Sequence, residues 1–190
     1  METENIDINR KLVEKARQGN QQAMYRLYGM YLPAMYNTCI RIVANQFDAE
    51  DIIQESFISA FGGIKKFRGE STFGTWLKRI VINKSLDHLR SNKLSFTDCE
   101  NIQIEDSGPE DDELPEIPME IIHQAIKSLP EKARVVLNLY LLEGYKHREI
   151  AETLGISEST SKSQYLRAKD LLKEILLKEI ARVRNGSEKL

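Results

Sequence analysis

The chain has 190 residues, of which 41% are hydrophobic and 29% are charged, and its formal net charge is −2. This length and composition fit one or two small globular domains. The polar, acidic start METENIDINR excludes a secretory signal, and no apolar run approaches the roughly 20 residues that cross a bilayer. Two distant cysteines, Cys39 and Cys99, give no disulfide framework or metal site. We therefore expect a cytoplasmic protein without membrane insertion and without a cofactor.

The net charge conceals an uneven distribution along the sequence. Residues 1–93 carry 14 basic and 10 acidic side chains, residues 94–118 carry no basic and 9 acidic ones, and residues 119–190 carry 13 and 10. Two mildly basic blocks are thus joined by a strongly acidic segment. Because that segment masks the basic blocks, the overall charge does not argue against binding to nucleic acid.

The first block, residues 1–93, is predicted to be helical throughout. Apolar residues at helical spacing run over 12–16 and over 23–31, and the turn signal Gly19-Asn20 separates them. Pro33 should kink the second helix or start a new turn there.

A further helix is predicted over 49–61, with Asp48 as its N-cap and with a weakened end at Gly62-Gly63. Its outward side mixes acidic and apolar residues. Such a face on a basic block favours docking to a basic protein partner over contact with DNA, although a solvated surface would show the same pattern. The candidate contact residues are Asp48, Asp51, Gln54, Glu55 and Ile58.

A long helix is predicted from Ser71 or Thr72 to about Arg90, and it is apolar over most of its circumference. One polar stripe remains, through Thr72, Trp76, Arg79, Asn83 and Arg90. Arginines interleaved with aromatic rings are typical of single-stranded DNA binding, because bases stack on the rings and arginines follow the phosphates. The alternative is that the aromatic residues are core; we expect this for Phe73, and it stays open for Trp76. The candidate DNA contacts are Phe67, Arg68, Thr72, Trp76, Arg79 and Asn83.

Residues 94–118 show no sustained periodicity and contain Pro109, Pro115 and Pro118. They are predicted to form an extended linker that spans up to roughly 80 Å. Residues 119–190 are predicted to be helical again, with one apolar stripe ended by Pro130 and another, which includes Tyr140 and Leu142, ended by Gly144. A helical tail follows Leu171.

A helix-turn-helix is predicted in this last block. A short helix over 147–154 is followed by Gly155 at the turn and by Ser157 as the N-cap of a second helix. At 100° per residue, the core side of that second helix holds Ser161, Tyr165, Ala168 and Leu172. The opposite side carries short hydroxyl side chains and two cations, which suits contact with phosphates and base edges. The candidate DNA contacts are Ser157, Ser159, Thr160, Lys162, Ser163 and Arg167; a solvated helical hairpin is the alternative.

Three motifs now stand in a recognisable order: DAEDIIQESFISAF over 48–61, FRGESTFGTWLKRIVINKSLDHLR over 67–90, and EIAETLGISESTSKSQYLRAK over 149–169. They resemble the second and fourth conserved regions of the extracytoplasmic-function (ECF) sigma factors, in the sigma-70 family of bacterial RNA polymerase sigma factors. The resemblance covers nearly the whole chain outside the linker. It implies an all-α fold with a region 2 domain over 1–93, an acidic linker over 94–118, and a region 4 domain with the helix-turn-helix over 119–190.

The resemblance also implies a mechanism and partners. The helix with Asp51, Gln54 and Glu55 would bind the β′ clamp helices of the polymerase core, which also includes the β subunit. The loop after Phe67 and the stripe with Trp76 would open the −10 element and hold single-stranded DNA, and the recognition helix would read the duplex −35 element. The linker would thread through the core enzyme. Many members are held inactive by an anti-sigma factor, which becomes a candidate partner that no motif here identifies.

The sequence departs from the family at three positions of the recognition helix. Ser161 stands where members often have valine, and we expect its hydroxyl to bond the carbonyl of Ser157 four residues back. Gln164 and Leu166 stand where many members have arginine and histidine, so the −35 sequence cannot be inferred. A stand-alone helix-turn-helix regulator is the alternative function, but it leaves the docking helix and the acidic linker without a purpose. No motif indicates an enzyme, because the histidines show no metal-ligand spacing and no nucleophile motif is present.

Overall fold

The computed structural model describes the backbone of residues 2–91 and 117–187 and the side chains of 9–91 and 117–182. The chain forms two compact units, 1–93 and 94–190, which are called here the N-terminal and C-terminal units. All regular elements in the described ranges are helices, which agrees with the all-α prediction. Of the predicted linker, only Ile117 and Pro118 lie within the described residues.

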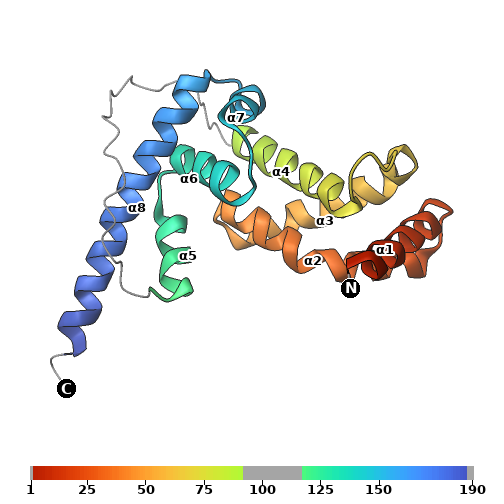
Figure 1. Ribbon diagram of the computed structural model, residues 1–190, viewed down its shortest axis with the longest axis horizontal. Coiled ribbons are helices and arrows are strands. Elements are labelled where there is room, and N and C mark those ends of the chain that lie inside the picture. Colours follow the sequence, from red (N-terminus) through yellow and green to blue (C-terminus); the bar gives the residue numbers. More distant parts are fainter. Residues whose placement is uncertain (1, 92–116, 188–190) are drawn as a thin grey trace. The chain divides into compact units, whose positions relative to one another are not determined.

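The N-terminal unit is a bundle built around three long helices. It contains α1 (Glu2–Arg17), α2 (Gln21–Val43), α3 (Gln46–Gly63), the short 3₁₀ helix η1 (Ile64–Lys66) and α4 (Phe73–Ser91). Helices α2, α3 and α4 all pack against one another, and α1 packs on α2 (Figure 1). Their shared core consists of aliphatic side chains that are almost fully buried, among them Leu27, Ile42, Leu77, Ile82 and Leu86. Burial of these apolar faces holds the bundle together.

Helix α2 is continuous through Pro33, so no separate helix begins at this residue. Proline removes only one hydrogen bond from the helix, the one that its own N–H would donate to the carbonyl of Gly29. Both residues are exposed, so water can satisfy that carbonyl. The helix ends instead at Ala44, which adopts the left-handed conformation with φ of 58°.

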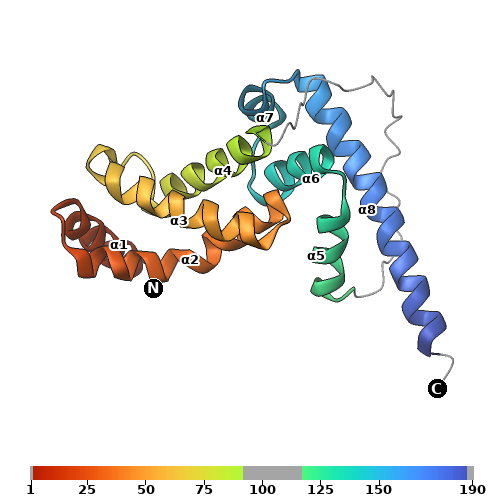
Figure 2. The same cartoon turned by 180° about the vertical axis from the view of Figure 1, so that it is seen from behind.

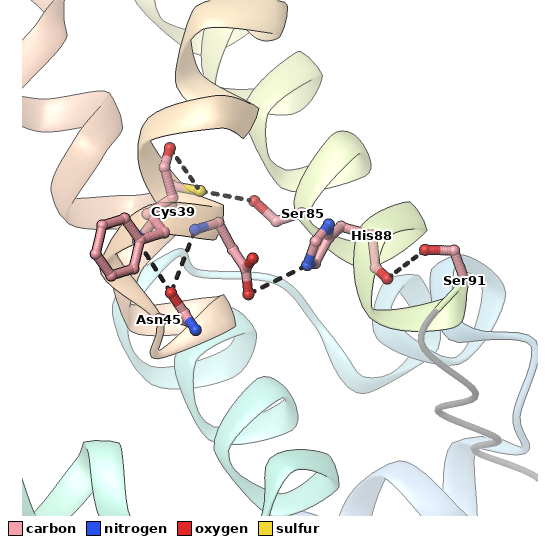
Figure 3. Close-up of polar contacts among 8 residues, drawn as sticks. Cys39, Asn45, Ser85, His88 and Ser91 are labelled. Carbon is pink, nitrogen blue, oxygen red and sulfur yellow. Dashed lines mark hydrogen bonds and ion pairs between the residues drawn. The ribbon is translucent and has the colours of Figure 1, made fainter.

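Helix α3 begins at Gln46, whereas the sequence predicted a helix that begins at residue 49 with Asp48 as its N-cap. Asn45 is the N-cap, because its side-chain oxygen accepts hydrogen bonds from the backbone N–H groups of Phe47 (2.9 Å) and Asp48 (3.3 Å) (Figure 3). Asparagine and aspartate are both good N-caps, and the left-handed Ala44 places Asn45 at the start of the helix. At the other end, α3 stops at Gly63, as the glycine pair predicts.

Cys39 lies at the contact between α2, α3 and α4. Its thiol is 3.9 Å from the carbonyl oxygen of Ala49 and accepts a hydrogen bond from the hydroxyl of Ser85 at 3.3 Å (Figure 3). Burial raises the pKa of the Cys39 thiol to about 11, so the thiol stays protonated and acts as a small packed group.

The C-terminal unit is arranged along one long helix. It contains α5 (Met119–Ser128), α6 (Glu131–Leu137), the π-helical turn η2 (Asn138–Leu142), α7 (His147–Leu154) and α8 (Glu158–Ser187). Helices α5, α6 and α7 each pack on α8, and both views show them along the same side of it (Figures 1 and 2). The hydrophobic core cluster of this unit comprises Ile126, Leu129, Ala133, Leu137 and Ala168.

The π turn η2 explains another error in the sequence prediction. Tyr140 and Leu142 were expected to continue the buried stripe, but 37% and 43% of their surfaces are exposed. The backbone N–H of Glu143 donates to the carbonyl of Asn138, five residues back, at 3.0 Å. This wider turn shifts the following side chains away from the core. Gly144 then ends the segment with φ of 74°.

Within the described residues, no helix is both long enough and apolar enough to span a membrane.

Substituting Asn45→Ala should lower the free energy of unfolding of the N-terminal unit by about 1 kcal/mol, because two backbone N–H groups at the start of α3 lose their acceptor. Chemical denaturation followed by the fluorescence of Trp76, the single tryptophan, reports on this unit. The control is Asn37→Ala at an exposed site within α2, where we expect a change within about 0.5 kcal/mol. Equal stabilities of wild type and Asn45→Ala would show that this cap does not hold α3.

Candidate nucleic-acid interfaces

The docking face of α3 consists of exposed acidic and apolar side chains. Asp51, Gln54, Glu55 and Ile58 are all exposed, and 73% of the surface of Ile58 is accessible. Glu55 lies 3.3 Å from the ammonium group of Lys84 on α4, which ties this edge of the face to the bundle. An exposed isoleucine beside carboxylates is typical of a protein contact rather than of a DNA contact.

Asp48 does not share this face. Its carboxylate oxygen lies 3.3 Å from Nε2 of His88 on α4, and both side chains are partly buried (Figure 3). Asp48 therefore links α3 to α4 within the unit. A role in binding the polymerase stays a prediction for this residue, and its contact with His88 makes a structural role sufficient to explain it.

Phe47 extends the docking face, and sequence reasoning missed it. It lies one turn before Asp51, and 78% of its surface is exposed. The predicted helix began at Ala49, so Phe47 fell outside it. The cap signal of Asn45 was available in the sequence and would have placed Phe47 on the helix.

The second candidate surface starts at the loop between η1 and α4. Thr72 caps α4, since its hydroxyl accepts the backbone N–H of Thr75 at 3.1 Å. Thr72, Arg79 and Asn83 are exposed and follow one side of α4, and Arg68 is exposed on the loop. Arg68 lies 3.9 Å from Glu70, but both side chains are more than three-quarters exposed, so this ion pair contributes little. The exposed side chains of this stripe and of Arg68 can therefore be reached by a ligand.

The aromatic residues of this surface form one cluster with graded exposure. Phe73 is 4% exposed and packs against Tyr31, so it belongs to the core, as predicted. Phe67 is 9% exposed, and its ring centre lies 5.2 Å from that of Trp76. Trp76 remains partly exposed, with Phe67 and Phe73 beneath it. In this arrangement Trp76 is the partly exposed member of the cluster, and Phe67 packs against it from the buried side.

The helix-turn-helix is formed by α7, Gly155 and the start of α8. Gly155 has φ of 68°, a conformation that favours glycine, and it ends α7 as predicted. Ser157 caps α8, since its hydroxyl accepts the backbone N–H of Thr160 at 3.0 Å. Among the candidate contacts, Ser157, Ser159, Lys162 and Arg167 are exposed, and Thr160 and Ser163 are partly exposed. All six therefore lie outside the core.

Several of these polar groups already have local partners. The hydroxyl of Ser163 donates to the carbonyl of Ser159 at 3.0 Å, and Lys162 forms an ion pair with Glu158 at 2.8 Å. Lys162 lowers the pKa of the exposed Glu158, first through a hydrogen bond and then through its charge. Binding to phosphate would have to replace the carboxylate of Glu158 as the partner of Lys162.

The opposite side of α8 is buried, as its periodicity predicts. Ser161 and Ala168 are fully buried, and Tyr165 and Leu172 pack against the core cluster. Gln164 is only 8% exposed. Gln164 thus lies on the core side of α8 and does not face outward with the candidate DNA contacts.

Ser161 bonds a different partner from the one predicted. Its hydroxyl lies 3.0 Å from Nδ1 of His147 on α7, whereas the carbonyl of Ser157 accepts the backbone N–H of Ser161. The imidazole of His147 stacks on Tyr140, with ring centres 4.3 Å apart and planes 12° apart. The sequence spacing alone does not reveal the imidazole as the partner of the Ser161 hydroxyl, because the imidazole comes from another helix.

Comparisons with known proteins agree with these two units. The model of the sigma-70 region 2 family matches residues 27–94, and that of sigma-70 region 4 matches residues 119–172. The ECF RNA polymerase sigma-E factor of Haemophilus influenzae is 31% identical over 173 residues, which cover 85% of this chain and 91% of that protein. The RNA polymerase sigma-H factor of Pseudomonas aeruginosa is 33% identical over 180 residues, covering 88% and 93%.

Solved structures show the same fold. The sigma factor RpoE of Bartonella quintana, determined in complex with the anti-sigma factor NepR, matches with a TM-score of 0.53 and 22% identity, covering 80% of this chain and 95% of that one. CnrH, determined in complex with the cytosolic domain of CnrY, matches with a TM-score of 0.52 and 22% identity, covering 88% and 96%. Taken with the two sequence relatives, these matches place the chain in the sigma-70 family: it is an RNA polymerase sigma factor of the ECF type, which directs the core polymerase to specific promoters and initiates transcription.

Proposed function

We propose that this sigma factor divides its work among three surfaces. The face of α3 binds the polymerase core, the stripe on α4 with its preceding loop handles the −10 element, and the outward side of α8 reads the −35 element. The observation that supports this division most directly is the separation of chemistry within the N-terminal unit. The exposed charges of the α3 face are the carboxylates of Asp51 and Glu55, whereas that of the α4 stripe is the guanidinium of Arg79, with Arg68 on the preceding loop. The place of action is that of the polymerase, the cytoplasm.

The α3 face suits the clamp helices of the β′ subunit. Asp51 and Glu55 supply negative charge for a basic partner, and Phe47 and Ile58 supply apolar contact area on either side of them. An apolar contact surrounded by charges is the usual composition of a protein interface. Phe47, Asp51, Gln54, Glu55 and Ile58 form this surface, and Asp48 supports it from behind through His88.

The α4 stripe suits the unpaired non-template strand of the −10 element. A partly exposed Trp76 held by two buried phenylalanines is a rigid platform for one base. Arg68 and Arg79 are positioned to neutralise phosphates, and Thr72 and Asn83 are positioned to hydrogen-bond a base or the backbone. Rigid support of Trp76 favours binding because few degrees of freedom are lost when a base stacks on it.

The α8 surface suits the major groove of the −35 element. Ser159, Thr160 and Ser163 are short, which allows α8 to approach the duplex closely, and Lys162 and Arg167 supply charge. The C-terminal unit would also contact the β subunit of the core, and the acidic linker would pass through a channel of the core enzyme that normally holds nucleic acid. An anti-sigma factor is a further proposed partner, on the analogy of the Bartonella quintana sigma factor RpoE, which was solved with one.

Transcription in vitro with purified core tests this division, because start-site mapping supplies a promoter and each surface then has its own readout.

The substitution Asp51→Lys should weaken binding to the core at least about tenfold, because it places like charges together at the interface. Binding of labelled sigma factor to core measures this effect. The control is Glu14→Lys on the exposed side of α1. An unchanged affinity of Asp51→Lys would remove α3 from the core interface.

The substitution Arg79→Ala should reduce promoter opening about tenfold while core binding stays normal, since Arg79 is exposed and supports no packing. Permanganate reactivity of unpaired thymines in a pre-assembled complex measures opening. Arg26→Ala, which removes an exposed arginine of α2, is the matched control. Normal opening combined with weaker core binding would assign Arg79 to the polymerase interface instead.

The substitution Arg167→Ala should weaken holoenzyme binding at low salt and lower the salt dependence of that binding by about one unit of log–log slope, because one phosphate contact is lost. Titrations of a promoter fragment at several salt concentrations measure the slope. Arg182→Ala removes an exposed arginine 15 residues further along the same helix, where it pairs with Glu179, and should leave the slope unchanged. An identical slope for Arg167→Ala and wild type would exclude Arg167 from the DNA interface.

A further inference from the structure

We propose that His147 is a positioning residue for the recognition helix, and that its hydrogen bond to Ser161 fixes the rotation of α8 against α7. The two side chains come from the two helices of the helix-turn-helix, and Nδ1 of His147 lies 3.0 Å from the hydroxyl oxygen of Ser161. The effect of this bond on DNA reading rests on the proposed role of α8 at the −35 element. The bond itself is a property of the free protein.

Packing fixes the imidazole before the hydrogen bond is considered. His147 is the first residue of α7, and its ring lies nearly parallel to that of Tyr140 in η2, with 4.3 Å between the ring centres. Tyr165 of α8 completes the cluster, 4.6 Å from Tyr140 and 5.7 Å from His147. Three elements therefore meet at one ring, which leaves the imidazole little freedom to turn away from Ser161.

Ser161 has the complementary requirement for a partner. It is fully buried, and a buried hydroxyl is almost always hydrogen-bonded. An apolar residue such as valine at this position would pack without any polar partner. In this chain the position is polar, and the histidine that satisfies it stands on the neighbouring helix. The pair thus replaces a non-directional apolar contact by a directional one.

Burial and the nearby charges favour the neutral form of the His147 ring. Burial lowers the pKa of His147, the charge of Lys162 lowers it further, and Glu158 opposes them; Tyr140 and Tyr165 face the ring as neutral groups, and Arg148 is its neighbour on α7. The imidazole is therefore neutral near pH 7. A neutral imidazole has one donor and one acceptor nitrogen, and a hydroxyl pairs with either.

The location of Ser161 gives the bond its functional importance. Its neighbours Thr160 and Lys162 are proposed DNA contacts, and Ser159 and Ser163 lie two residues away on each side. Because these short side chains reach only a small distance into a groove, a small rotation of α8 would displace all of them together. A bond at the centre of this segment is well placed to prevent that rotation.

Nuclear magnetic resonance of the full chain with ¹⁵N-labelled histidine tests the bond without DNA. We expect Ser161→Ala to shift the Nδ1 signal of His147 and to leave the ring signals of His88 and His123 in place. The control Thr153→Ala removes another hydroxyl, one that donates to the carbonyl of Glu149 within α7, and should not shift the His147 signals. An unchanged His147 signal in Ser161→Ala would overturn the proposal.

A double-mutant cycle tests the positioning role. His147→Phe keeps an aromatic ring against Tyr140 but removes the nitrogen, and Ser161→Ala removes the hydroxyl. Each should lower transcription from a mapped promoter about fivefold, with no effect on a template whose −35 element is scrambled, and the double variant should equal either single one. Independent effects, about 25-fold in the double variant, or no effect of His147→Phe would overturn the proposal.

The two tests separate this inference from the proposed function. If wild type transcribed equally well from intact and scrambled −35 templates, the proposed role of α8 would fail, and the positioning role would fail with it, whatever the nuclear magnetic resonance result. If −35 dependence were present and only the cycle showed independent effects, the proposed function would stand and the positioning role alone would be wrong.

Discussion

The inward side of α8 is set by its packing on the core cluster, to which α8 contributes the buried Ala168, with Tyr165, Leu171, Leu172 and Ile175 packed against it. A side chain as small as alanine lets two helices approach closely, and close approach determines which residues of α8 are inside. Once Ala168 and Ser161 are buried, the positions between them on the other side of the helix must be outside. The exposure of the proposed DNA contacts on α8 is therefore a consequence of apolar burial and not of the polar residues themselves.

The same reasoning applies to the N-terminal unit, where α4 packs against both α2 and α3. Burial of Leu77, Val81, Ile82 and Leu86 leaves only a narrow side of α4 accessible. That narrow side brings Arg79, Asn83 and the partly exposed Trp76 into one stripe. A small bundle has little surface to spare, so each exposed face of it can be assigned to one partner.

Elements whose signals are local and chemical could be predicted from the sequence. Gly155 and Ser157 define the turn of the helix-turn-helix through backbone conformation and capping, and periodicity along α8 separated its two sides correctly. Where two local signals compete, prediction failed. Asn45 and Asp48 are both suitable N-caps, and only the left-handed Ala44 decides between them.

Contacts between separate elements could not be predicted in this way. The π turn at Asn138–Leu142 exposes Tyr140, and this exposed ring is the one on which His147 stacks. Neither the turn nor the stacking has a signature in periodicity, because both depend on how η2 packs against α7 and α8. The link between Asp48 and His88 is of the same kind, since 40 residues separate its partners along the chain.

Polar groups at the contact between helices carry a cost and an advantage that apolar groups lack. A buried hydroxyl loses its hydrogen bonds to water, and only a well-placed partner replaces them. Ser161 therefore stabilises α8 in one rotation and disfavours others. Valine at the same position would tolerate several rotations with similar packing. A recognition helix that contacts DNA through serine and threonine benefits from such a directional constraint, because side chains this short cannot compensate for a helix that is turned away. The requirement for accuracy at the DNA surface thus gives a physical reason for a polar pair in the core behind it.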